Sequence, residues 1–363
     1  MFKAQNQRLK YVDSAKGIGI LMIAWGHLDK MKSPVFVLFS ASKLAVFFIL
    51  SGLMFAHRWQ VYGKKEDCRS LIQKRLYSLL IPYLVYSLFA ILFHIAFAAD
   101  SYIGAKSIIT DDLLMTISLR GMSTLWFLPT LFFGEVMFAA TNVYDWSKAK
   151  RGIVTVSLPI AAIALAVCYQ KIIWEGYKCT IIGYLLVVFA KSMVAFWFIQ
   201  IGYYSYEFMN CVKYNRLLII LIAGLVSIPL SMLNTGVDFN NLVFGKDPLL
   251  FFVNGVAGSL FLLALLKQLE KYCSLAVTSF CGRNSLFIMA THLPWYLCTA
   301  VSLLGKKICC LETGNGYYIL ILLELIVVMQ IEVLLIYCKH WLKSLLLKRA
   351  DAHGVLARTL RYL

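Results

Sequence analysis

The sequence contains little charge for its length. Only 15% of its 363 residues are Asp, Glu, Lys or Arg, whereas about a quarter are charged in a typical soluble domain. Hydrophobic residues make up 61% of the chain, and the mean hydropathy is +0.76. This composition excludes a soluble two-domain enzyme, a disordered chain and a disulfide-stapled secreted module. The aromatic content of 14% agrees, because Trp and Tyr favour membrane interfaces.

The sequence also lacks paired cysteines and a recognisable leader. Its ten cysteines include no C-x-x-C pair, and most fall in or beside apolar segments. We interpret them as small buried hydrophobic residues, and we expect no metal site. The first apolar run carries Asp13, Lys16 and His27 and has no small-residue cleavage site. It is therefore not expected to be a cleavable signal peptide.

Long apolar runs predict an all-α integral membrane protein. A helix needs roughly 20 mostly apolar residues to cross the hydrocarbon core, and ten segments meet this requirement. They are approximately 12–30, 35–56, 76–99, 124–141, 152–170, 180–203, 217–233, 248–266, 285–304 and 317–338. The short connections predict one transmembrane bundle over 1–342, followed by a short basic tail over 343–363. The tail is expected to be either an interfacial amphipathic helix or a simple topogenic segment.

The distribution of positive charge predicts the orientation. The net charge of +17 would favour nucleic acid as the partner of a soluble protein, but Lys and Arg also collect on the cytoplasmic loops of membrane proteins. If the amino terminus is cytoplasmic, the inside segments hold 24 of the 35 Lys and Arg residues and the outside segments hold 9. We therefore expect both termini in the cytoplasm, membrane lipid as the surroundings and no nucleic-acid partner.

Three ionisable residues lie on one face of the first predicted span. Lys16 and His27 are eleven residues apart, so they project from the same side of a helix, about 16 Å apart along its axis, and Asp13 lies close to this face. An ionisable group in a span is a functional candidate because its burial in lipid is costly. A snorkelling cation at Lys16 and a structural hydrogen bond at His27 are the plain alternatives.

Other polar residues stand out in the later spans. Ser51 and Gly52 are typical of a helix-packing notch, and Trp126 is typical of an interface anchor. Glu135 needs a partner in the membrane, and His292 is a second histidine within a span. Lys191 in the sixth span is expected to pair with a membrane carboxylate. The carboxylates available are Glu135, Glu324 and Glu332.

Five segments together resemble the acyltransferase 3 family, and most closely its fucose 4-O-acetylase-like branch. The strongest is YVDSAKGIGILMIAWGH, where the family has Asp, a basic residue, ten further residues and His. Many members have Arg at the basic position, where this chain has Lys16. The other segments are FFILSG (47–52), KRLYSLLIPY (74–83), LWFLPTLF (125–132) and SLFIMATH (285–292). The resemblance extends from about residue 8 to about residue 340.

This resemblance implies a reaction and a set of roles. An acyl group, with acetyl the favoured case, would pass from acyl-CoA to a hydroxyl of a cell-surface carbohydrate or its lipid-linked precursor. His27 matches the essential histidine of the family and would act as the general base, since imidazole accepts protons near neutral pH. An acyl-histidine intermediate is the alternative. Lys16, with Asp13, would orient the acyl donor.

The remaining roles concern binding. Lys74 and Arg75 would bind the CoA phosphates, and the residues expected to line the acceptor site are Ser51, Trp126, Glu135 and His292. No cofactor is expected to be resident, because acetyl-CoA or another acyl-CoA is a substrate. The family resemblance favours a bacterial inner membrane. Two other classes stay open: a transporter or flippase for a small anion or lipid-linked sugar, since intramembrane Lys, His and Glu also line transport paths, and a membrane protein without chemistry.

Overall fold

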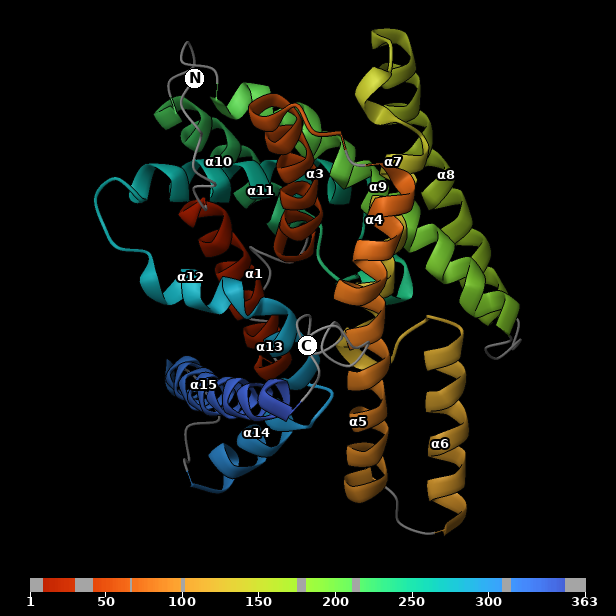
Figure 1. Ribbon diagram of the computed structural model, residues 1–363, viewed down its shortest axis with the longest axis vertical. Coiled ribbons are helices and arrows are strands. Elements are labelled where there is room, and N and C mark those ends of the chain that lie inside the picture. Colours follow the sequence, from red (N-terminus) through yellow and green to blue (C-terminus); the bar gives the residue numbers. More distant parts are fainter. Residues whose placement is uncertain are drawn as a thin grey trace.

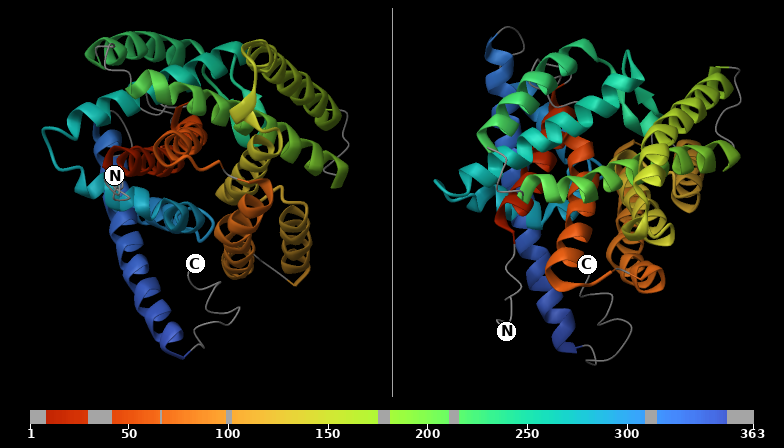
Figure 2. Two further views of the ribbon diagram at one scale, coloured as in Figure 1. Left: turned by 45° about the horizontal axis from the view of Figure 1, so that its top comes forward. Right: turned by 90° about the horizontal axis from the view of Figure 1, so that it is seen from above.

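The computed structural model describes residues 9–29, 42–65, 67–98, 102–174, 181–210, 216–308 and 315–349, and these are almost entirely helical. Two antiparallel helices, α1 (Lys10–Leu28) and α3 (Ser42–Tyr62), lie side by side in the middle of the bundle. The other helices surround this pair (Figures 1 and 2). Because α1 and α3 are shielded from the surroundings by protein, they can carry the polar residues that lipid-facing helices exclude.

The surrounding helices follow in chain order. They are α4 (Cys68–Arg75), which continues through a π-helical turn, Leu76–Leu80, into α5 (Ile81–Ala98), then α6 (Tyr102–Ile117), α7 (Phe127–Ala140), α8 (Lys148–Trp174), α9 (Ile181–Asn210), α10 (Arg216–Leu233), α11 (Pro248–Leu269), α12 (Ala276–Arg283), α13 (Ser285–Thr291), α14 (Leu297–Ile308) and α15 (Asn315–Arg349). Short 3₁₀ turns stand at Ser123–Trp126, Val143–Asp145 and Phe239–Asn241. A two-stranded hairpin, β1 (Val237–Asp238) and β2 (Val243–Phe244), joins α10 to α11.

Close helix crossings fix the central pair. A Cβ atom added to Gly52 of α3 would lie 1.8 Å from the carbonyl oxygen of Ile199 on α9, and one added to Gly17 of α1 would lie 1.8 Å from that of Thr278 on α12. Backbones that approach this closely leave room only for glycine. The interpretation of Gly52 as part of a packing notch is therefore confirmed.

Seven helices of the described residues are long and apolar enough to cross a membrane. They are Ser42–Tyr62, Cys68–Phe97, Ser123–Ala140, Lys148–Lys171, Ile181–Met209, Pro248–Leu269 and Gly316–Leu345. The all-α membrane fold is thus confirmed, whereas a count of ten spans is not. The predicted span 12–30 is helical as α1 but is more polar, and 217–233 forms the shorter apolar helix Leu217–Leu233.

The predicted span 285–304 is wrong as a single helix. It is broken between α13 and α14, and Tyr296 in the break has a positive φ of 62°. The sequence at the break is His292-Leu293-Pro294, and proline cannot donate the backbone hydrogen bond that would continue a helix. The break leaves His292 at the carboxyl end of α13.

Two further elements differ from the predicted pattern. Helix α6 packs against α5, and its carboxylate Asp112 accepts a hydrogen bond from Nδ1 of His94 at 2.7 Å. The sequence predicts no span here, because acidic residues interrupt the apolar pattern. At the other end, α15 continues beyond residue 342 to Arg349, and the rest of the predicted basic tail lies outside the described residues.

Candidate active site

A cavity of about 590 Å³ with both polar and apolar walls opens beside His27, and we call it the His27 cavity. Five parts of the chain form its walls: the last turns of α1, the first turn of α3, the segment around the 3₁₀ turn Ser123–Trp126, the segment of the β1–β2 hairpin, and the end of α13 with Met289 and Leu293. The lining side chains that carry polar or aromatic groups are His27, Lys43, Ser123, Thr124, Trp126, Phe127, Thr235, Asp238, Phe239 and Asn240. The structure thus brings His27 and Trp126 together, as the site prediction requires.

The hairpin that closes the cavity is held by Asn234. Its Nδ2 atom donates to the carbonyl oxygen of Phe244 at 2.9 Å, and its Oδ1 atom accepts from the backbone N–H of Asp247 at 2.9 Å. Asp247 then caps α11 by accepting from the N–H of Leu249 at 2.8 Å, with Pro248 at the first helical position, where proline costs no hydrogen bond. These bonds hold Asp238 and Asn240 over the cavity.

His292 lies against His27. The centres of the two imidazole rings are 5.3 Å apart, and the ring planes are inclined by 44°. His292 is completely buried and is not among the residues that line the His27 cavity. Its Nδ1 atom lies 2.6 Å from the carbonyl oxygen of Ile288, one turn earlier on α13. The predicted site residue His292 therefore stands behind His27, and contact with a bound acceptor falls to His27 and the other lining residues.

Buried cations support the wall that contains Trp126. The ammonium of Lys191 lies 4.5 Å from the centre of the Trp126 ring and donates to Oδ1 of Asn240 at 3.2 Å. Arg120 donates to the side-chain oxygens of Asn240 and Asn241, the latter at 2.8 Å. Lys191 thus contacts a tryptophan and an amide, and the predicted pairing of Lys191 with a membrane carboxylate is not what the structure shows.

A second polar group, the Glu135 cluster, lies further along the same helices and consists of Ser51, Arg75 and Glu135. Arg75 forms an ion pair with Glu135 through Nε and donates from Nη2 to Oε1 at 3.0 Å, and Ser51 donates to the same oxygen. Only 1% of Glu135 is exposed. Arg75, predicted to bind CoA phosphates, therefore binds Glu135. Arg75 is thus the partner that the buried Glu135 carboxylate needs.

Further cations stand near the Glu135 cluster. Arg58 and Lys74 are close enough to Arg75 for electrostatic interaction. Lys74 is exposed, while Arg58 is half-buried with its guanidinium 5.6 Å from the centre of the Phe55 ring. Three cations thus share one buried carboxylate, which leaves this region with an excess of positive charge.

A layer of phenylalanine rings separates the two polar groups. Phe47 and Phe48 of α3 pack on Phe127 of α7, with ring centres 5.5 Å and 5.1 Å apart. Eight residues separate Lys43 from Ser51 on α3, and eight separate Phe127 from Glu135 on α7. Each spacing corresponds to about 12 Å along a helix. The His27 cavity and the Glu135 cluster therefore lie about 12 Å apart along one pair of helices.

Asp13 and Lys16 lie away from the His27 cavity. Because α1 is one unbroken helix, Lys16 lies about 16 Å from His27 along the axis, and Asp13 about 21 Å. Their end of α1 crosses α12, where the hydroxyls of Ser14 and Ser279 are 2.8 Å apart and a Cβ atom on Gly282 would lie 1.7 Å from the carbonyl oxygen of Asp13. The structure does not gather Asp13, Lys16 and His27 into one catalytic group.

An exposed ion pair marks the end of the molecule beyond the Glu135 cluster. Lys65, between α3 and α4, lies 2.5 Å from Asp145 and 4.9 Å from the centre of the Trp59 ring. Hydrogen bonds from Lys65 and Asn142 hold the pKa of the Asp145 carboxyl below its usual range. This pair ties the connection after α3 to the 3₁₀ turn after α7.

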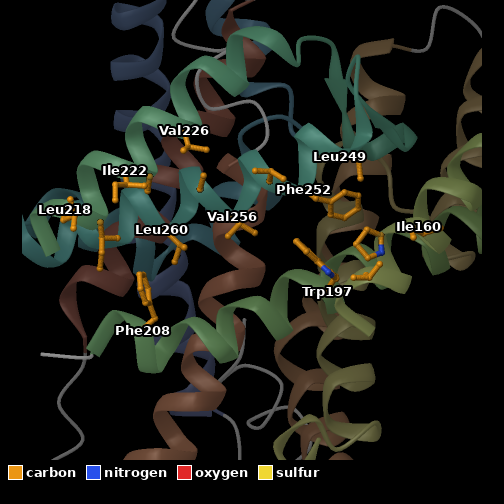
Figure 3. A pocket seen from close by; sticks show the side chains of 16 residues that line it. Ile160, Trp197, Phe208, Leu218, Ile222, Val226, Leu249, Phe252, Val256 and Leu260 are labelled. Atoms are coloured by element: carbon orange, nitrogen blue, oxygen red, sulfur yellow. The ribbon is translucent and has the colours of Figure 1, made fainter. Parts of the chain in front are cut away.

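A larger hollow than the His27 cavity is a different feature. It is an apolar groove of about 800 Å³ between α8, α9, α10 and α11, and Figure 3 shows its lining of aliphatic and aromatic side chains. None of its lining residues is ionisable, so it offers no group for proton transfer. Among the described residues, no three His, Cys, Asp or Glu side chains come together as a metal site.

Sequence reasoning missed several residues of the His27 cavity. Lys43 carries a signal, since a lysine within an apolar run is a functional candidate, but the sequence pattern assigns it no role. Asp238 and Asn240 come from a connecting segment, as does Arg120, which donates to Asn240. No local pattern predicts that these segments fold over the end of α1.

The fold and the cavity define a multi-pass membrane protein with a histidine on the wall of a cavity inside the helix bundle. A family model described as an acyltransferase domain, that of the acyltransferase 3 family, matches residues 9–328, and the chain belongs to this family. The match includes His27, Trp126, Glu135 and His292. The comparisons with curated proteins and with solved structures give no match. The protein is thus a membrane acyltransferase.

Proposed function

We propose that the protein transfers an acetyl or related acyl group from acyl-CoA to a hydroxyl of a cell-surface carbohydrate or of its lipid-linked precursor, and that transfer occurs in the His27 cavity. The observation that carries the proposal is the position of His27. Its imidazole lines the cavity together with Trp126, at one end of a helix that matches the family. An aromatic ring and polar groups around one hollow suit a sugar, which has apolar faces and hydroxyl edges.

The proposed chemistry uses His27 as a general base. An unperturbed imidazole titrates near pH 6.5, so it accepts a proton at neutral pH. The acceptor hydroxyl attacks the thioester carbonyl carbon while His27 takes the hydroxyl proton. The new C–O bond forms, the C–S bond breaks, and the CoA thiolate leaves and receives the proton from the imidazolium. The products are an acyl ester and free CoA.

The donor is proposed to bind beside the Glu135 cluster, further along α3 and α7 from the His27 cavity. The excess of Lys and Arg on one side, counted from the sequence, supports a cytoplasmic position for the Glu135 cluster and Lys74. Lys74 and Arg58 would hold the CoA phosphates, because they add positive charge beside the Glu135 cluster and the Lys74 side chain is exposed. Arg75 would hold the bundle together through Glu135 and Ser51. Lys16 and Asp13 lie near the start of α1, at the end of this helix opposite His27, and they would face the donor.

A location and a set of partners complete the proposal, and the family resemblance supports them. We place the protein in the bacterial inner membrane, with both termini in the cytoplasm. The acyl-CoA is taken from the cytoplasm and used as a substrate, with no resident cofactor. The acceptor reaches His27 from the opposite side. The pantetheine arm of the donor would extend past Phe47, Phe48 and Phe127 to bring the thioester to His27.

The test is the transfer of label from acetyl-CoA labelled in its acetyl group. Membranes that contain the protein are incubated with the donor, and label is counted in total cell-surface glycan. The His27→Ala variant should lose roughly 10²- to 10⁴-fold in rate, the usual contribution of a general base. His340→Ala, which removes an exposed histidine of α15, is the matched control and should transfer normally.

Two results would contradict the proposal. Equal labelling by native protein and His27→Ala, at equal protein level, would remove His27 from the mechanism. Native protein that moves no label from acetyl-CoA or from longer acyl donors, while it supports flux independent of any acyl group, would favour a transporter.

A further inference from the structure

The ring nitrogens of His292 have two different environments. Nδ1 lies 2.6 Å from the carbonyl oxygen of Ile288, and a carbonyl oxygen only accepts hydrogen bonds. Nδ1 must therefore carry the hydrogen. In the neutral imidazole this leaves the lone pair on Nε2. Nε2 is buried and has no hydrogen-bond partner among the described residues.

The helix break holds this ring in place. The backbone N–H of His292 also donates to Ile288 at 3.0 Å, and its carbonyl oxygen accepts from the N–H of Cys298, across the break, at 2.8 Å. The preceding residue, Thr291, donates to both carboxylate oxygens of Glu332 on α15, at 2.7 and 2.9 Å. These bonds fix the end of α13 against α15, and with it the direction of the His292 ring.

The neighbour of this ring is His27. The ring centres are 5.3 Å apart, and no hydrogen bond joins Nε2 of His292 to His27 as the rings stand. At this spacing a rotation of the His27 ring brings one of its nitrogen atoms to about 3 Å from Nε2, an ordinary hydrogen-bond distance. His27 lines the cavity, whereas His292 lies behind it. A group that stands behind a general base and accepts its remaining N–H selects the tautomer of the base.

We propose that His292 is a positioning residue that selects the tautomer of His27 by accepting a hydrogen bond at Nε2. The ring nitrogen of His27 that faces His292 then carries hydrogen, and the other nitrogen presents its lone pair to the cavity. When His27 takes the acceptor proton, the hydrogen bond to the neutral His292 stabilises the imidazolium. The proton remains on His27 until it passes to the CoA thiolate. The inference rests on the proposed function, since it assigns His292 a role toward that base.

Two substitutions of different reach test this role. The amide of His292→Asn occupies the position of Nδ1 and can still donate to Ile288, but it has no acceptor at the position of Nε2. The longer His292→Gln places an amide oxygen near Nε2. We expect His292→Asn to lower kcat at least about tenfold with little change in the KM for acetyl-CoA. His292→Gln should recover most of that loss.

A double variant distinguishes positioning from a structural role. If His292 acts through His27, then His292→Asn costs nothing further in the His27→Ala background. A merely structural role would lower the residual rate in both backgrounds. Acetyl-CoA binding and elution of the purified protein as a single species are the controls for folding.

The outcomes separate this inference from the proposed function. If His27→Ala is inactive but His292→Asn transfers as fast as native protein, the role of His292 is wrong and the general base stands. If His292→Asn and His292→Gln lose equally, acceptance at Nε2 is wrong. If His27→Ala keeps native activity, the proposed function itself fails, and the positioning role fails with it.

Discussion

The His27 cavity and the Glu135 cluster are built from the same two helices but treat their polar groups in opposite ways. At the cavity, α3 supplies Lys43 and the start of α7 supplies Phe127, and polar groups from four parts of the chain face open space. At the cluster, α3 supplies Ser51 and α7 supplies Glu135. Glu135 binds both Arg75 and Ser51. The polar groups of the cavity can therefore receive a ligand, whereas Ser51, Arg75 and Glu135 hold helices together.

This difference explains why we assign different roles to the polar residues of the cavity and of the cluster. A buried carboxylate that already binds a guanidinium and a hydroxyl has little capacity left for a ligand. An imidazole on a cavity wall, with a second buried imidazole behind it, keeps a free edge for chemistry. The effects of substitutions should therefore divide, with stability lost at the Glu135 cluster and turnover lost at the His27 cavity.

The largest effect on stability is expected when the buried ion pair is broken. Glu135→Leu leaves the Arg75 guanidinium without its carboxylate, which should cost about 3–5 kcal/mol. The double variant Glu135→Leu with Arg75→Leu removes both charges and should be more stable than Glu135→Leu. Thermal unfolding of the purified proteins in detergent measures both. If the double variant is stable but fails to bind acetyl-CoA, Arg75 has a direct role in donor binding as well.

The next effect concerns the crossing that positions α1. A Cβ atom on Gly17 would meet the backbone oxygen of Thr278 at 1.8 Å, so Gly17→Ala should force the helices apart and cost roughly 1–3 kcal/mol. Gly152→Ala on α8 is the control, since nothing lies within 4 Å of the added atom. It should be neutral or slightly stabilising. Equal unfolding temperatures for the two variants would contradict the close crossing.

A change at Lys43 should affect turnover and leave donor binding alone. Lys43 lines the His27 cavity, where a charged donor can bind the acceptor or the developing oxyanion. Lys43→Met should lower the transfer rate about 10- to 100-fold, because hydrogen bonds to charged groups contribute roughly 1.5–3 kcal/mol. Acetyl-CoA binding, followed by calorimetry, should stay native. Weaker donor binding would place the donor phosphates at the wrong end of α3.

The smallest effect is expected at the exposed pair Lys65–Asp145. Asp145→Asn should change neither transfer nor the unfolding temperature measurably at pH 7, since water and salt screen exposed pairs. The lowered pKa of Asp145 gives the sign of any contribution. It is present above the ordinary carboxyl pKa and is lost as the pH falls through the lowered value. Unfolding temperatures recorded down the acid range for native protein and Asp145→Asn would reveal it.

Much of the fold could be predicted because apolar runs have a direct physical cause. Lipid forces backbone groups to bond within each helix, so most spans are visible as hydrophobic segments. The errors occurred where polar residues or proline interrupt this signal. Pro294 broke a span predicted as continuous, and the acidic residues of α6 concealed a helix.

The site could be predicted only where its residues lie in the membrane helices. His27 and Trp126 were found because each stands out in an apolar segment and matches the family. The partner of Glu135 was not predictable, since the side chains that meet across helices depend on packing. The hairpin that carries Asp238 and Asn240 has no hydropathy signal, and only the folded chain shows it closing the cavity.

The central claim is that acyl transfer occurs in the His27 cavity and that the donor binds beside the Glu135 cluster. One paired measurement tests this claim. Acetyl-CoA binding and label transfer to cell-surface glycan are measured together for His27→Ala and Lys74→Glu. The account predicts that His27→Ala binds the donor as native protein does but does not transfer. Lys74→Glu should bind weakly and transfer at near-native rate when the donor is saturating. Loss of donor binding in His27→Ala, with native binding in Lys74→Glu, would contradict this division.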